Sequence, residues 1–312
     1  MACNFEFAAR LVRLRALLFA TLVLGLAGCD STEPLNPDSS TPIELGVEEA
    51  EVTEPSLAAV RFAGGIPIGT FGQPLSAFGS YYNGAKMTVS PSGLTKYLAS
   101  VKARGGKVVL MFAGPDHNYK DRRGFNFTKW KARIDRFRSV KIAPYISDGT
   151  IIGHLLVDEP NDPSNWYGKM ISPGMVDEMA RYSKSRWSNL ATLVRAEPKY
   201  FSNRRPRYLD AAWAQYVTRK GTAPDYIRRN VADAQRAGLS LVVGLNITKG
   251  GPNRRRLTAN EVKSFGSAML SSSYPCAFIS WEYGSYQLSG SMRDAMRMLR
   301  GKAQSRSSKS CR

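Results

Sequence analysis

The sequence predicts an α/β protein in which eight strand–helix units close into a parallel (β/α)8 barrel. Short apolar segments begin near residues 108, 151, 191, 208, 241 and 277, mostly 33 to 43 residues apart, and this spacing is typical of parallel βα units. The length of 312 residues suits such a barrel. An open, doubly wound sheet is the alternative. No glycine-rich GxGxxG turn follows the first strand, which disfavours a nucleotide-binding sheet.

The candidate strands are continuous apolar runs, as expected for strands that are buried on both faces. One further strand is expected between Ile66 and Tyr82. We therefore identify seven strands, so the barrel is either irregular, lacks a strand, or contains an eighth that the pattern does not reveal. The other six candidates are Val108–Ala113, Ile151–Val157, Thr192–Arg195, Tyr208–Ala212, Leu241–Leu245 and Ala277–Trp281.

Helical periodicity lies between these strands. Apolar residues repeat at helical spacing from Leu94 to Val101, where Gly105 follows as a stop, and again from Trp130 to Phe137. Thr258 and Glu261 have the spacing of a capping box, which predicts a helix that begins there. The last stripe consists of Met292, Met296 and Leu299, and we interpret it as core packing.

Charge is distributed unevenly along the chain. The net charge is +19, yet residues 30–60 contain eight acidic and no basic residues. Residues 61–312 contain 41 of the 44 basic residues and 16 of the 25 acidic ones, a net charge of +25. Residues 29–58 are rich in Pro, Ser, Thr and Glu, so we expect a disordered acidic linker. It precedes a strongly basic domain.

The N-terminus has the pattern of an export signal. Three arginines precede an apolar run from Ala16 to Gly28, which is too short to span a bilayer comfortably. The sequence Leu26-Ala27-Gly28-Cys29 resembles the lipobox of bacterial lipoproteins. This resemblance implies that Cys29 receives a lipid and that the protein is anchored to the bacterial cell envelope.

These patterns divide the chain into four segments. We expect a lipoprotein signal peptide at 1–28, the acidic linker at 29–58, the barrel at 59–302 and a basic tail at 303–312. Cys276 and Cys311 lie beyond the signal, and an exported protein reaches an oxidising compartment. They are therefore either a disulfide that holds the tail or two separate thiols.

Acidic residues follow several of the predicted strands. In α/β barrels catalytic side chains lie at the carboxyl ends of strands. Here these ends carry Asp158 with Glu159, Glu197 and Glu282, and Asn246. Glycoside hydrolysis needs two carboxyl groups, one to protonate the leaving oxygen and one as nucleophile or base. The four acidic residues are therefore candidate catalytic groups, and Asn246 is a candidate for orienting the substrate.

Side chains alternate between the two faces of a strand, and this alternation predicts which residues point into the barrel. It places Arg195 on the face of Glu197, and Ser280 on the face of Glu282. On the strand before Asp158 it groups His154 with Asp158, which favours Asp158 over Glu159 as the inward carboxylate. We count Arg195 and His154 as candidate substrate-binding residues.

The segment Gly153–Pro160, which reads GHLLVDEP, resembles a strand end of glycoside-hydrolase-like TIM barrels in secreted bacterial proteins. The resemblance implies that Glu159, the acid directly before the proline, donates the proton. Glu197 and Glu282 resemble the two other carboxylate positions of this group. Asp158 stands where the familiar Asn-Glu-Pro tripeptide has asparagine. The alternation and the resemblance favour different residues, so Asp158 and Glu159 both remain candidates.

Aromatic side chains near the predicted rim could form sugar platforms, and the candidates are Trp166, Trp213, Trp281 and Tyr283. Asp116 and His117 follow a strand end, where they could touch the substrate, but a solvated loop is the favoured interpretation. The chain contains two histidines and no HExxH, CxxC or GxSxG motif. We therefore expect no metal site, no cofactor and no serine-hydrolase chemistry.

The positive charge suggests an anionic partner. No nucleic-acid-binding module is recognisable, so we expect no nucleic-acid partner; an acidic polysaccharide suits an exported basic surface better. The sequence thus predicts a lipid-anchored glycoside-hydrolase-like protein that acts on a carbohydrate polymer, anionic or neutral. The alternative is a non-catalytic surface lipoprotein that binds anionic polysaccharide through its basic face. The sequence does not determine the oligomeric state.

Overall fold

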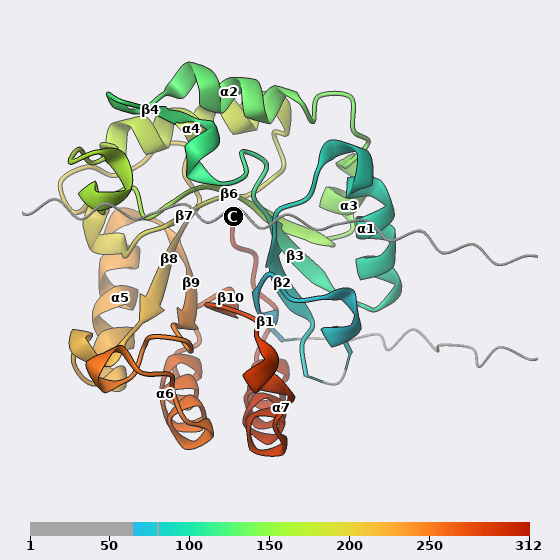
Figure 1. The fold of residues 1–312 in the computed structure, drawn as a ribbon, viewed down its shortest axis with the longest axis vertical. Helices are drawn as coiled ribbons and strands as arrows, with labels where there is room; N and C mark the ends of the chain where they lie inside the picture. Colours follow the sequence, from blue (N-terminus) through green and yellow to red (C-terminus); the bar gives the residue numbers. More distant parts are fainter. Residues whose placement is uncertain (1–64, 80) are drawn as a thin grey trace, which may run out of the picture. The chain divides into compact units, whose positions relative to one another are not determined.

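The computed structural model describes residues 65–79 and 81–312. The predicted signal peptide, the acidic linker and Cys29 lie outside these described residues. Eight parallel strands form a closed barrel in the order β1-β10-β9-β8-β7-β6-β3-β2, and helices surround them (Figure 1). The predicted barrel is therefore confirmed, and no strand is missing from it.

The strands are short, and their order around the barrel follows the chain. They are β1 (Ile68–Phe71), β2 (Gly84–Met87), β3 (Lys107–Leu110), β6 (Ile151–Asp158), β7 (Thr192–Arg195), β8 (Ala211–Tyr216), β9 (Ser240–Leu245) and β10 (Ala277–Ser280). A separate hairpin of β4 (Lys120–Asp121) and β5 (Gly124–Phe125) lies between β3 and β6. The two ends of the sheet meet because β1 pairs with both β2 and β10.

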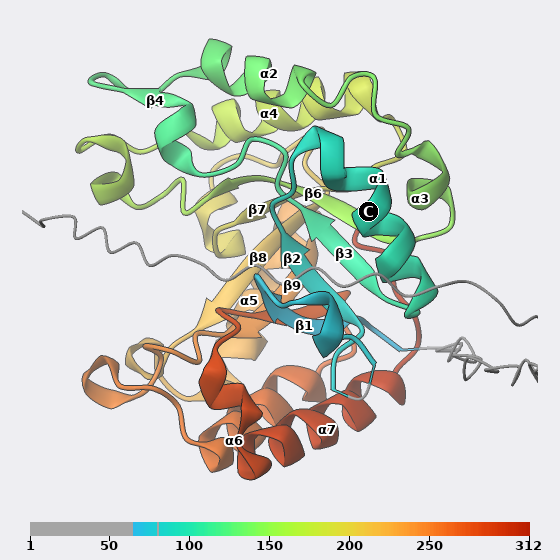
Figure 2. The same cartoon turned by 45° about the vertical axis from the view of Figure 1, so that its right-hand side comes forward.

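Seven α-helices occur among the described residues. They are α1 (Pro91–Ala103), α2 (Phe127–Asp135), α3 (Ala143–Ser147), α4 (Pro173–Arg186), α5 (Ala223–Ala237), α6 (Ala259–Ser271) and α7 (Gly290–Gln304). No helix in this part of the chain is long and apolar enough to cross a membrane. The α2 and α4 helices lie on one side of the barrel and α6 and α7 on the opposite side, as the turned view shows (Figure 2).

The barrel is irregular at two connections. The β1–β2 and β7–β8 links contain only single 3-10 turns, at Leu75–Ala77 and Pro198–Phe201, where a regular barrel has α-helices. This explains the short spacing between the predicted strands near 191 and 208. Between β3 and α2 the chain forms a further 3-10 turn, Asp116–Asn118, and the β4–β5 hairpin.

Local sequence accounts for most helix ends. Thr258 and Glu261 form the predicted capping box at the start of α6. The α1 helix buries Leu94, Leu98 and Val101, the stripe that predicted it. The other longer helices also bury apolar residues against the barrel, whereas the short α3 helix has no buried residue.

Two strand predictions need correction. The predicted strand Tyr208–Ala212 actually spans Ala211–Tyr216, because Asp210 ends the preceding link by accepting hydrogen bonds from Thr192. The eighth strand, β2, was missed. Its sequence is Gly-Ala-Lys-Met, which contains no β-branched or aromatic residue and so carries no strand signal.

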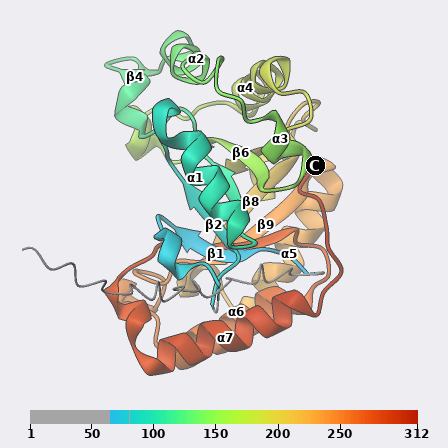
Figure 3. The same ribbon diagram turned by 90° about the vertical axis from the view of Figure 1, so that its right-hand side faces the viewer.

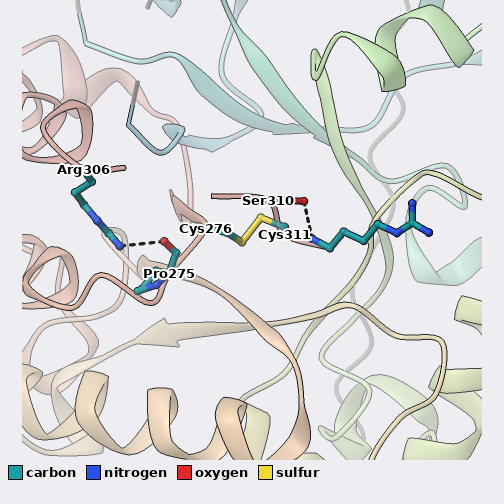
Figure 4. Close-up of a disulfide and its surroundings, with 6 residues drawn as sticks. Pro275, Cys276, Arg306, Ser310 and Cys311 are labelled. Atoms are coloured by element: carbon teal, nitrogen blue, oxygen red, sulfur yellow. Dashed lines mark hydrogen bonds between the residues drawn. A yellow bond between two sulfur atoms is a disulfide. The ribbon is translucent and has the colours of Figure 1, made fainter. Parts of the chain in front are cut away.

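Cys276 and Cys311 form a disulfide across a sequence separation of 35 residues. It holds the end of the chain against the start of β10 (Figure 4). Arg306 donates a 3.0 Å hydrogen bond to the carbonyl of Pro275 next to it. The tail after α7 runs back along the barrel to this point (Figure 3). Of the two alternatives for these cysteines, the disulfide is therefore the one found.

Candidate active site at the carboxyl ends of the strands

A pocket of about 520 Å³ opens at the carboxyl ends of the barrel strands. Side chains from six strands or the residues directly after them contribute to it, which is the usual place for an active site in this architecture. The residues that line it are Lys86, Thr88, Met111, Pro115, Asp116, Tyr119, Asp158, Glu159, Asn165, Trp166, Arg195, Asn246 and Trp281.

Arg195 organises the floor of this pocket. Its side chain is 9% exposed, and its Nε donates a hydrogen bond to Oδ1 of Asp158. A second guanidinium nitrogen lies 3.4 Å from Oε1 of Glu159, and a third donates a 2.5 Å hydrogen bond to Gln215. Burial lowers the pKa of Arg195, but the two carboxylates outweigh it and leave the pKa raised. The guanidinium is therefore a fixed cation that holds both candidate acids.

Glu159 has a left-handed backbone, with φ of 43°, and turns the chain out of β6. Its amide donates to the carbonyl of Arg195, and its own carbonyl accepts a 3.0 Å hydrogen bond from the indole of Trp166. The amide of Asn165 lies 3.5 Å from its Oε2. Its carboxyl group is 46% exposed, against 31% for Asp158. Both predicted acids thus reach the pocket, and Glu159 is the more accessible.

Trp281 supplies an aromatic wall to the pocket. Its ring lies 5.1 Å from the ring of Phe71 and 5.3 Å from the guanidinium of Arg195, measured to ring centroids. Asn246, a candidate from the sequence, also lines the pocket. There its Oδ1 accepts a 2.9 Å hydrogen bond from the amide of Lys249. An aromatic face beside carboxyl and amide groups is suited to a sugar ring.

Several solved structures share this architecture. The chain aligns with a GH18 chitinase from Pseudoalteromonas aurantia at 11% identity, with a TM-score of 0.50, over 76% of this chain and 99% of the other. It aligns with a Pyrococcus horikoshii endocellulase in complex with cellotetraose at 11% identity and a TM-score of 0.51, over 77% and 92% of the chains. A cellulase–inhibitor complex gives 10% identity and a TM-score of 0.53, over 75% and 92%.

The chain has a glycoside-hydrolase-like barrel fold. At these identities the likeness establishes the fold alone. No family model matches the sequence, and no curated protein matches it. What this glycoside-hydrolase-like barrel does must therefore be argued from its own pocket.

Seven lining residues were not among the site residues proposed from the sequence, and two of the seven, Lys86 and Asp116, are charged. Lys86 lies on the strand that was missed, and its Nζ is 5.1 Å from the ring centroid of Phe71. Burial lowers the pKa of Lys86 to about 8, although the carboxylates of Asp158 and Glu282 act in the opposite direction. Asp116, for which substrate contact was the less favoured alternative to a solvated loop, lines the pocket and forms a 2.5 Å ion pair with Lys120.

Glu197 lies outside the pocket, contrary to its prediction as a catalytic group. Its carboxylate forms an ion pair with Lys220 and accepts a 3.3 Å hydrogen bond from the hydroxyl of Tyr226 on α5. The chain turns into the 3-10 segment Pro198–Phe201 directly after it. The alternation of side chains between the two faces of β7 therefore ends at Arg195. Glu197 pairs with Lys220 and does not reach the pocket.

His154 is also misplaced by the alternation. Between Leu155 and Asp158 the register of β6 against β7 shifts, with three residues of β6 opposite two of β7. Beyond this irregularity the side chains of β6 change from one face of the strand to the other. Asp158 therefore points into the pocket, while His154 packs against the helices. Its Nδ1 lies 2.8 Å from Oγ of Ser183 on α4, and burial lowers its pKa to about 3. It is fully buried and cannot touch a substrate.

The remaining aromatic candidates have different positions. Trp213 is 1% exposed in the barrel interior, where its indole donates a 3.2 Å hydrogen bond to Ile279. Trp166 is also 1% exposed, so it positions Glu159 and offers no open platform. Tyr283 lines a second, smaller pocket. Glu282, predicted as a catalytic carboxylate, lines neither pocket, although its charge acts on Lys86 in the larger one. Among the described residues, no group of three or more His, Cys, Asp or Glu side chains could hold a metal ion.

Proposed function

We propose that the protein hydrolyses glycosidic bonds in a carbohydrate polymer. The observation that carries this proposal is the placement of two carboxyl groups, on Asp158 and Glu159, beside the Trp281 ring in a pocket at the strand ends. The hydrolase-like fold is consistent with it, and two of the aligned structures are described as an endocellulase with cellotetraose and a cellulase with an inhibitor. The polymer is the substrate, and no cofactor takes part in the proposed chemistry.

In the proposed reaction Glu159 is the proton donor. It is the more exposed of the two acids, so it can reach the oxygen of the leaving sugar. Asp158, which accepts a charge-assisted hydrogen bond from Arg195, stabilises positive charge that develops on the sugar ring. Glu282, which directly follows the pocket residue Trp281 and whose charge acts on Lys86 in the pocket, is the third acid and acts as base towards water or as nucleophile. Asn246 and Trp281 orient the sugar.

The test is the release of reducing sugar from a panel of neutral and acidic polysaccharides by the full-length protein, purified in a non-ionic detergent. Glu159→Gln and Glu282→Gln should each lower the rate at least 100-fold, in line with the usual contribution of acid–base catalysis. Glu197→Gln is the matched control, because Glu197 carries the same group after the next strand but pairs with Lys220. Equal loss of activity in all three variants, or no release by the parent protein, would contradict the proposal.

One observation favours the non-catalytic alternative, a lipoprotein that binds anionic polysaccharide. Arg195 lies 3.4 Å from Glu159 and is hydrogen-bonded to Asp158, so both candidate acids already have an ion-pair partner inside the protein. If the parent protein binds polysaccharide without releasing sugar, and its binding weakens steeply as salt is added, the binding function replaces the catalytic one.

We further propose that the protein is exported and anchored to the bacterial cell envelope through lipid on Cys29. The arginine-flanked apolar run and the lipobox-like residues before Cys29 support this. The Cys276–Cys311 disulfide is consistent with an oxidising compartment. The net charge of +25 over residues 61–312 would favour an anionic polymer as the substrate.

A further inference from the structure

A second pocket of about 160 Å³ is lined by residues between β1 and β2, by the segment after β10 and by α7. Tyr81, Tyr82 and Tyr283 contribute three aromatic rings to its lining. Tyr283 also donates a backbone hydrogen bond of 2.9 Å to Phe71 at the end of β1. Figure 2 shows that the segment between β10 and α7 runs next to β1. Trp281 lines the larger pocket, and Tyr283, two residues later in the chain, lines the smaller one.

The smaller pocket contains a polar group that lacks a partner. Gln287 is 4% exposed and lines the pocket, and its Nε2 has no hydrogen-bond partner in the described part of the chain. Its Oε1 accepts a 3.4 Å hydrogen bond from the amide of Gly284, which holds the side chain in place. A buried amide donor without a partner costs stability. A ligand in the pocket would supply the missing acceptor.

The charged group in the lining of the smaller pocket is positive. Arg293, on the first turns of α7, is the charged residue in its lining, and no aspartate or glutamate lines the pocket. Among the described residues Arg293 has no carboxylate within ion-pair distance, unlike Arg297 one turn later, which pairs with Asp294 at 2.7 Å. An unpaired guanidinium beside an unpaired amide donor is suited to a carboxylate.

We infer that this pocket binds a carboxylate-bearing sugar residue of the polymer, with Arg293 and Gln287 as its polar contacts and the tyrosine rings against the sugar. This inference rests on the proposed function, because it places a second sugar of the same chain beside the one in the larger pocket. It also narrows the substrate class to polysaccharides that contain uronic acid. The larger pocket gives no such preference, since its cations Arg195 and Lys86 share it with the carboxylates of Asp116, Asp158 and Glu159, and Arg195 already pairs with the last two.

The test compares the binding of a neutral and an acidic tetrasaccharide, cellotetraose and tetragalacturonate, by calorimetry. The full-length protein carries Glu159→Gln so that neither ligand is hydrolysed. We expect the acidic ligand to bind more tightly. Arg293→Gln should weaken its binding about tenfold or more, the effect of losing a charge-assisted hydrogen bond, and should leave cellotetraose unchanged. Arg293→Lys should restore part of the loss.

Two controls separate this site from diffuse surface charge and from misfolding. Arg138→Gln removes an exposed arginine between α2 and α3 that lines neither pocket, and it should change binding less than twofold. Gln287→Leu removes the unpaired amide, so it should weaken the binding of tetragalacturonate more than that of cellotetraose while the melting temperature stays the same or rises. If Gln287→Leu leaves binding unchanged, the amide has no ligand and the inference is wrong.

Other outcomes would also overturn the inference. Equal binding of the two ligands, with no effect of Arg293→Gln, would remove the acidic subsite and leave the proposed hydrolysis of a neutral polymer in place. Equal weakening by Arg293→Gln and Arg138→Gln would indicate non-specific attraction by the basic domain. If neither ligand binds and the parent protein releases no sugar from any polymer, the proposed function fails and the inference fails with it.

Discussion

The guanidinium of Arg195 on β7 is hydrogen-bonded to the carboxylate of Asp158 at the end of β6, on the floor of the pocket. The arginine is almost entirely buried and the aspartate is partly exposed. Breaking a buried ion pair by removing one partner leaves an uncompensated charge. This pair therefore connects the stability of the barrel with the geometry of the candidate active site.

Removing Asp158 should destabilise the protein more than removing a comparable acid elsewhere. We expect Asp158→Ala to lower the free energy of unfolding by about 3 kcal/mol, because Arg195 loses its main partner. Glu197→Ala is the control. Its pair with Lys220 is about one-third exposed on each side, so its loss should cost less than about 1 kcal/mol. Chemical denaturation measures both values, and equal costs would show that Arg195 does not depend on Asp158.

His154 should make the protein sensitive to acid. Burial lowers its pKa in the folded state to about 3 from the usual 6.5, so below pH 6.5 the unfolded chain binds a proton that the folded chain does not. The stability that this histidine contributes is complete above pH 6.5. It should fall by about 1.4 kcal/mol per pH unit as the pH drops from 6.5 towards 3.

Urea unfolding at several pH values between 7 and 4 tests this dependence. The His154→Met variant should lose less stability on acidification than the parent protein, whatever its stability at pH 7. His117→Gln removes the other histidine, which lies in the exposed 3-10 segment after β3, and should leave the pH dependence unchanged. Parallel curves for the parent protein and His154→Met would refute the assignment.

The Cys276–Cys311 disulfide should stabilise the fold. It closes a loop of 35 residues, and the chain-entropy relation gives about 4 kcal/mol for a loop of that length. Adding a reductant should therefore lower the melting temperature. The double variant Cys276→Ala/Cys311→Ala should melt at the lower temperature with or without reductant. A parent protein that melts at one temperature in both conditions would show that the bond contributes little.

Lipidation of Cys29 is tested in a bacterial host. The mature protein should begin at Cys29, carry acyl chains that mass spectrometry detects, and enter the detergent phase on phase separation. More than one acyl chain makes such anchoring stable. Cys29→Ala should lose both the added mass and the detergent partitioning. Identical partitioning of this variant and the parent protein would rule out the lipid anchor at this residue.

The barrel was predictable because its strands are buried on both faces. Val108, Leu155 and Val243 belong to apolar runs whose spacing indicates parallel βα units, and all three are fully buried. The β2 strand was not predictable in this way, since its central residues Ala85 and Lys86 have no strand preference. Its place between β1 and β3 follows from backbone pairing with both neighbours.

The candidate site was only partly predictable. Asp158, Glu159, Arg195, Asn246 and Trp281 reach the pocket as residues that follow or end strands. His154 and Glu197 do not, because alternation assumes an unbroken strand. The register shift in β6 and the 3-10 turn after Glu197 both break that assumption. The register shift has no sequence signal of its own, whereas Pro198 at the start of the 3-10 turn is such a signal.

The sequence by itself determined the alternation of strands and helices, the polar residues at the strand ends and the uneven charge, since these depend on the order of residue types along the chain. Only the tertiary structure decided which of those residues meet. Lys86 and Asp116 join Glu159 in one pocket, while Arg293 and Gln287 line another. Such groupings depend on the closure of the barrel and on the register between strands, and both arise from packing between segments far apart in the chain.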